Sequence, residues 1–228
     1  MEENFDAALL LSKRVDTTNT QPIINQTLRI AMYEEYRKYE MYKKAIEQFG
    51  FVTPFTNIVA AKEQHLAELN HFLQRYQVAL PTNDWAQKVT IPNTLKEAYE
   101  IGVGAELESI GMYSHLVEYT ENEDIKDLFF RIQAASYNNH LPTFRTHLEH
   151  ALENTKEVKE GISQEAIMDK VNEWSELAQK IASNEMSQAE ISKLFQNANL
   201  SFLGGILLGG IGASILTQMG EDKDNEEG

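Results

Sequence analysis

The chain has 228 residues, of which 42% are hydrophobic and 24% charged, enough for one generous folded domain with a real core. It contains no cysteine, which excludes a disulfide scaffold, a thiolate zinc site, an iron–sulfur cluster and a cysteine nucleophile. The formal net charge of -15 would repel a phosphate backbone, and no basic patch offsets it. We therefore expect no nucleic-acid partner.

Residues 1–22 form an N-terminal arm that lacks the basic start and long apolar stretch of a secretory signal, so we expect the folded part of the chain to be cytoplasmic. Helical periodicity then extends over four long stretches, at about 23–49, 54–78, 95–119 and 121–154. Gly50 is suited to end the first, and Thr53 to cap the second. Thr94 with Glu97, and Thr120 with Glu123, are capping-box patterns. The sequence thus predicts an all-α fold with a four-helix bundle over residues 23–154.

Three further segments follow the bundle. Residues 155–196 predict a helical hairpin, because the apolar residues of its first half share one helical face, namely Ile167, Val171, Trp174, Ala178 and Ile181. Residues 197–220 are apolar and rich in glycine, and residues 221–228 form an acidic tail.

Each long helix of the predicted bundle carries one polar residue within its apolar stripe. These are Glu35, His65, Glu106 and His140, one per helix in chain order. A buried carboxylate needs a cation, a metal or a proton. The pattern also repeats, since Glu35-x-x-Lys38-x-x-x-Tyr42 is echoed by Glu106-x-x-Ser109-x-x-x-Tyr113. The repeat indicates that the four polar residues converge at mid-bundle.

Four stretches carry a resemblance to a known superfamily: MYEEYRKYEMY, AAKEQHLAELNHFLQRY, IGVGAELESI and NEDIKDLFFRIQAASYNNHLPTF. Through them, residues 23–153 resemble the ferritin-like diiron superfamily, and look closest to a small prokaryotic ferritin-like family of uncharacterised function related to the rubrerythrins. The resemblance implies two irons held by a Glu from the first and third helices and a Glu-x-x-His from the second and fourth. Glu35, His65, Glu106 and His140 match that pattern.

Two positions depart from the pattern. Lys62 and Tyr137 stand three residues before His65 and His140, where the superfamily has bridging carboxylates. One hypothesis is that the four matching residues bind a single iron or manganese ion. Tyr137 and Lys62 would then tune the site or act in redox or proton transfer, and the protein would be an oxidoreductase of the ferroxidase type. The other is a metal-free polar network in which the Lys62 ammonium pairs with the two carboxylates. The position of Lys62 Nζ distinguishes these hypotheses.

Residues 200–219 carry no charge and would span about 30 Å as a helix, which is enough to cross the hydrocarbon of a bilayer. Gly205-x-x-x-Gly209-x-x-x-Ala213 would form a small-residue face for helix association, as in a glycine zipper. We expect this segment to anchor the chain to a membrane. The alternatives are burial in a homo-oligomer and docking on the shell protein of a compartment. The functional hypotheses are therefore a membrane-associated ferritin-like metal protein, a metal-free scaffold with a membrane-inserting or oligomerising tail, and compartment cargo.

Overall fold

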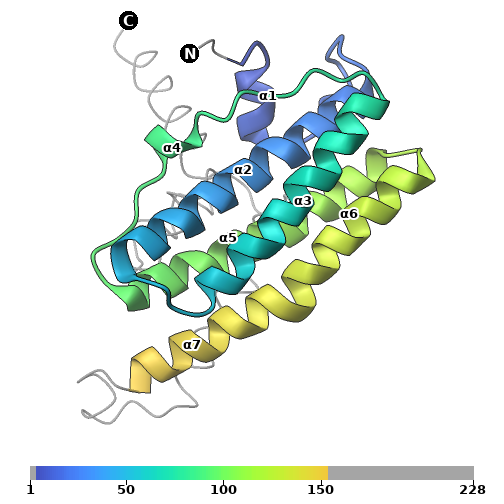
Figure 1. The fold of residues 1–228 in the computed structure, drawn as a ribbon. Helices are drawn as coiled ribbons and strands as arrows, with labels where there is room; N and C mark the ends of the chain where they lie inside the picture. The colour runs from blue at the N-terminus through green and yellow to red at the C-terminus, as the bar shows by residue number, and fades with distance from the viewer. Residues whose placement is uncertain (1–3, 154–228) are drawn as a thin grey trace, which may run out of the picture.

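The computed structural model describes residues 4–153, and within them the chain is an all-α bundle of four long helices (Figure 1). The first three are α2 (Ile23–Phe49), α3 (Phe55–Arg75) and α5 (Leu95–Tyr119). The fourth is continuous and consists of α6 (Glu123–Ala135), the π-helix η1 (Ser136–His140) and α7 (Leu141–Glu153). The prediction of an all-α four-helix architecture is confirmed.

The helix ends agree with the sequence in two places. Gly50 ends α2 with a positive φ of 85°, and its N–H donates to the Ile46 carbonyl. At the start of α5, Thr94 and Glu97 form the expected capping box, in which each side chain accepts from the other residue's backbone N–H. These local signals need only neighbouring residues, which is why the sequence alone could predict them.

Two other predicted caps are wrong because tertiary or local partners compete for the hydroxyls. Thr53 does not cap α3, since its Oγ1 lies 2.9 Å from His147 Nε2 on α7. Thr120 does not open α6 either. Its hydroxyl donates to the Leu116 carbonyl at 2.7 Å, so this residue closes α5 instead. Asn122 precedes α6 and makes no side-chain cap.

The fourth helix widens into the π-helix just before Pro142. Proline has no N–H to donate four residues back, and the preceding Leu141 N–H donates five residues back, to Ser136. A π-turn rotates each successive residue through a smaller angle than an α-turn does. Tyr137 and His140 are consequently further apart around the axis, and the two side chains leave the helix in different directions.

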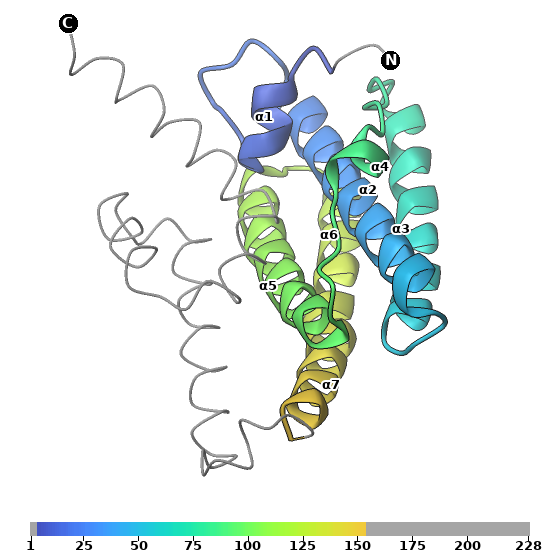
Figure 2. The same ribbon diagram turned by 90° about the vertical axis from the view of Figure 1, so that its left-hand side faces the viewer.

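Helix α2 packs most extensively on α3, and α5 on α7. Figure 2 shows the N-terminal arm lying across one end of this bundle. The arm contains a short helix, α1 (Ala7–Ser12), which the helical periodicity of the sequence does not predict. A second short helix, α4 (Trp85–Lys88), interrupts the connection between α3 and α5. Asp6 of the arm forms a buried ion pair with Arg29 of α2, and Leu10 is part of the hydrophobic core.

No helix within residues 4–153 is both long and apolar enough to cross a membrane. The predicted hairpin at 155–196, the apolar segment at 197–220 and the acidic tail at 221–228 lie outside the described residues.

Candidate functional site: a buried charge network

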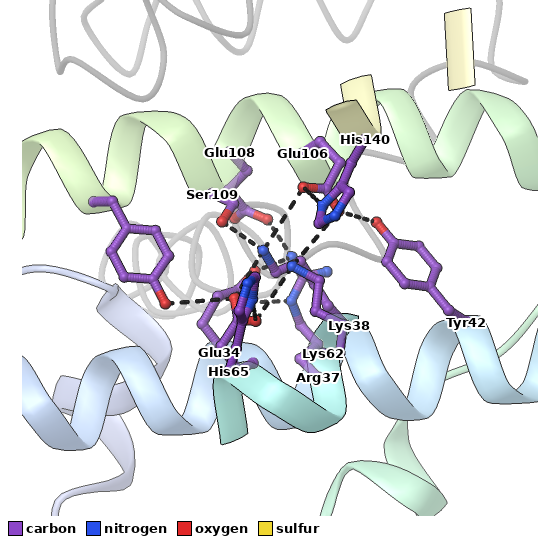
Figure 3. Close-up of polar contacts among 12 residues, drawn as sticks. Glu34, Arg37, Lys38, Tyr42, Lys62, His65, Glu106, Glu108, Ser109 and His140 are labelled. Carbon is purple, nitrogen blue, oxygen red and sulfur yellow. Dashed lines mark hydrogen bonds and ion pairs between the residues drawn. The ribbon is translucent and has the colours of Figure 1, made fainter. Parts of the chain in front are cut away.

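The centre of the bundle contains two carboxylates and two lysines, all fully buried: Glu35, Lys38, Lys62 and Glu106. Lys38 Nζ lies 2.9 Å from a Glu35 oxygen and 3.9 Å from a Glu106 oxygen. Lys62 Nζ lies 3.2 Å from Glu35 and 4.0 Å from Glu106. Both amines therefore lie between the two carboxylates, as Figure 3 shows for the labelled lysines and Glu106.

One imidazole pairs with each carboxylate. His65 Nδ1 is 3.0 Å from Glu35, His140 Nδ1 is 3.3 Å from Glu106, and the two ring centroids are 6.3 Å apart. The four residues predicted as metal ligands do gather in one region. They form two separate carboxylate–imidazole pairs, with the amines of Lys38 and Lys62 close to both carboxylates.

The sequence repeat becomes a set of reciprocal contacts between α2 and α5. Tyr42 of α2 donates to Glu106 of α5 at 2.6 Å, and Tyr113 of α5 donates to Glu35 of α2 at 3.4 Å. Lys38 donates to Ser109, its counterpart in the repeat, at 2.6 Å. When two similar helices are related by a local two-fold axis, a residue of one helix contacts the residue at the equivalent position of the other. The repeat therefore indicates which residues of α2 and α5 are in contact.

A second buried cluster adjoins the first through α2. Arg37 binds Glu34, one turn earlier on the same helix, and Glu108 of α5 at 2.7 Å. The N-terminal arm contributes Lys13, whose Nζ lies 2.9 Å from Glu34 and 2.6 Å from Glu108. Fully ionised, the two clusters together hold four carboxylates and four cations, and their charges cancel. These are Glu34, Glu35, Glu106 and Glu108 with Lys13, Arg37, Lys38 and Lys62.

The amines determine the ionisation of the central carboxyls. Burial by itself would raise the pKa of Glu35 and of Glu106, but Lys38 and then Lys62 outweigh it and hold both pKa values well below the usual range. In the adjoining cluster, burial likewise opposes ionisation of Glu34, yet Arg37 and Lys13 lower the pKa of Glu34 to about 2. The structure thus stabilises three ionised carboxylates in the interior.

The two lysines are not equivalent. Burial disfavours the charged form of both, but for Lys38 the attraction of Glu106 and Glu35 exceeds that cost and raises its pKa. For Lys62, the cost of burial is larger than the attraction of the same two carboxylates, so the pKa of Lys62 is lowered. The charge of the neighbouring Lys38 lowers the pKa of Lys62 further. The contacts agree with this difference, because Lys38 donates a short hydrogen bond to Ser109. Lys62 Nζ forms an ion pair with Glu35 at 3.2 Å but makes no well-aligned hydrogen bond to an acceptor among the described residues.

The arrangement does not fit a metal ion. Within residues 4–153, no group of three or more His, Asp or Glu side chains is placed to hold one. The negative charges of Glu35 and Glu106 are already balanced by two cationic amines. A divalent metal ion in the same space would therefore add positive charge that no carboxylate offsets. Of the two hypotheses drawn from the sequence, the geometry favours the one in which Lys62 pairs with both carboxylates.

Tyr137 is not where the resemblance implies. Its side chain is 63% exposed, so the expectation that it faces the centre is wrong. The π-helix explains the difference, since it turns His140 inward and leaves Tyr137, three residues earlier, on the outside. This exposed position does not support a role for Tyr137 in tuning a site at the centre of the bundle or in redox or proton transfer there.

No protein-family model and no curated protein matches this chain. A solved structure does. It is the crystal structure of hypothetical protein MJ0754 from Methanococcus jannaschii DSM 2661. Its TM-score is 0.53 and its identity 18%, over 69% of this chain and 97% of that one. At this identity the similarity establishes an all-helical fold in common and assigns no activity.

The apolar stripes of the sequence do not predict most of the buried charges. Lys38 stands out only as part of the repeat, and no apolar stripe marks Glu34, Arg37, Glu108 or Lys13 as buried. One signal was available, because Arg37 and Glu108 occupy equivalent positions of the repeat, just as Lys38 and Ser109 do. Residues at equivalent positions near a local two-fold axis contact each other, so the repeat predicts a contact between Arg37 and Glu108. Nothing comparable in the sequence indicates Lys13.

Proposed function

We propose that this protein is a non-enzymatic helical scaffold that works without a metal, descended from a ferritin-like bundle, and that its C-terminal apolar segment attaches it to a membrane. The observation that carries the metal-independent part is the position of the amines of Lys38 and Lys62 between Glu35 and Glu106. The charge that metals would supply in a diiron centre is here supplied by side chains.

The inaccessibility of the centre supports a structural role. Glu35, Lys38, Lys62 and Glu106 have no exposed surface, so a substrate could not reach them without opening the bundle. A cavity of about 280 Å³ does occur among the described residues, but it lies where the start of α2 meets the end of α5. Its lining includes Ile23, Thr27 and Tyr119, and no member of the charge network.

The first experiment measures metal content and metal dependence on the full chain. Purified without chelator, the protein should contain far less than one iron, manganese or zinc per chain. Its melting temperature should not change on adding EDTA, because its buried charges are already balanced by side chains. Stoichiometric metal, or a melting temperature that EDTA lowers and metal restores, would contradict the proposal.

The second experiment tests the attachment. The uncharged length of residues 200–219 supports membrane association, and we expect the full chain to pellet with membranes and to resist extraction by high salt. A variant ending at residue 196 should remain in the supernatant and keep the circular-dichroism spectrum of a folded helical protein. Equal distribution of the two forms would refute the attachment. Co-purification of the full chain with a compartment shell protein would instead favour the cargo hypothesis.

A further inference from the structure

The N-terminal arm is joined to α5 by a hydrogen bond whose acceptor is a histidine ring. The backbone N–H of Val15 donates to Nε2 of His115 at 3.0 Å. A ring nitrogen accepts a hydrogen bond only while it carries no proton, so this contact requires a neutral imidazole that is protonated on Nδ1. Protonation of Nε2 would place two donors opposite each other. The contact therefore exists in only one of the two charge states of His115.

Val15 belongs to the part of the arm that contacts α5. Its side chain is buried, and two residues earlier Lys13 places its Nζ 2.6 Å from Glu108. Glu108 and His115 are seven residues apart on α5, which is about two turns, and therefore share one face of that helix. The start of the arm is held separately, by the buried ion pair that Asp6 forms with α2. Loss of the contact at His115 would therefore loosen this part of the arm and leave its start in place.

The surroundings of His115 oppose its protonation. Burial, and then the charge of Arg14 on the arm, lower the pKa of His115, and Glu118 on α5 only partly offsets them. The remaining face of the ring contacts Tyr119, with the two centroids 4.8 Å apart. Arg14 directly precedes Val15, so the residue that opposes the imidazolium is carried by the same stretch of arm that needs the neutral ring.

We propose that His115 is an acid-sensitive latch, which holds the stretch around Val15 against α5 while the ring is neutral and releases it when the ring is protonated. The proposal goes beyond the proposed function and does not depend on it. In the released form the ring regains the ordinary histidine pKa of about 6.5. The latch is therefore closed above about pH 6.5, and each pH unit below that value raises the ratio of released to closed arm by up to about tenfold. The carboxyls of the central network ionise at lower pH, so the arm should open while the bundle stays folded.

The test is hydrogen exchange of the full chain, followed by mass spectrometry and corrected for the intrinsic exchange rate at each pH. In the wild type, the protection of residues 13–16 should fall roughly tenfold between about pH 7.5 and about pH 5. His115→Gln should keep its protection at both, because the amide oxygen can accept from the Val15 N–H and does not titrate. His71→Gln, the same substitution at an exposed histidine of α3, should behave as the wild type.

Equal protection of the wild-type arm at the two pH values would overturn the proposal. The same loss in His115→Gln as in the wild type would also overturn it and would assign the response to Glu108, whose protonation releases Lys13. Should His115→Gln lose the arm contact at both pH values, the NMR titration of the wild-type ring decides. A pKa of His115 below about 6.5 supports the latch. A pKa at or above that value overturns it, because a proton that binds the closed form equally well cannot open it.

Discussion

Replacing Lys38 with methionine should lower the free energy of unfolding by about 3–5 kcal/mol, the range found when one partner of a buried ion pair is removed. Methionine nearly preserves the volume of the side chain, so lost packing contributes little. The loss is electrostatic, since of its two ammonium partners Glu35 would keep only the more distant one, Lys62, and Ser109 would lose its donor. Urea unfolding followed by circular dichroism at neutral pH measures the change.

Lys62→Met is the matched control, because it deletes the other amine of the same centre. We expect it to cost less than half as much as Lys38→Met. Burial and Lys38 already lower the pKa of Lys62, so the folded state resists its charge, whereas the raised pKa of Lys38 shows that the folded state favours its charge. Equal losses for the two variants would mean that the amines contribute alike and that the difference in their contacts has no energetic consequence.

Acid should unfold the bundle steeply, below about pH 4.5. The pKa values of Glu34, Glu35 and Glu106 are all lower in the folded state than the value of about 4.3 for an unfolded Glu. A depressed carboxyl pKa gives stability that is complete above the unfolded value and is lost as the pH falls toward the folded value. Three such groups give a slope of about 4 kcal/mol per pH unit between about pH 4 and pH 2.

Glu108 acts in the opposite direction. Burial raises its pKa against the pull of Lys13 and Arg37, so its contribution decreases as the pH rises above the unfolded value, and it does not add to the acid transition. Urea unfolding at pH 3, 4, 5 and 7 measures the slope. Lys38→Met provides the comparison, since without that ammonium the central pKa values should return toward normal and the slope should become shallower. An identical slope in both proteins would assign the acid transition to surface carboxyls.

The sequence was sufficient for those features that depend on periodicity. The four long helices, the four polar residues within their stripes and the capping box at Thr94 follow from spacing along a single helix. The inward position of Lys62 could be proposed from its place three residues before His65. In each case the residues that decide the outcome are close in sequence, and a helix of known pitch places them.

The features that the sequence could not provide depend on contacts between helices. Threonine is a residue type that often caps helices, but the hydroxyls of Thr53 and Thr120 contact other groups instead. Tyr137 is displaced by a π-turn that ends at His140, which contacts Glu106 of another helix. Lys13 is the extreme case, because its partner Glu108 is in another helix, far along the chain.

That last contact has a consequence for the order of folding. The arm is the first part of the chain to be synthesised, yet Lys13 needs Glu108 and the Val15 N–H needs His115 Nε2, 100 residues away. Contacts so distant in sequence form late, because the loop between them must close first. Until α5 has been made and packed, Lys13 and Arg37 lack Glu108, the second carboxylate of their cluster. The contacts of Lys13 and Val15 with α5 should therefore form only after α5 has packed, and a nascent chain shorter than about 120 residues would leave the middle of α2 without Glu108.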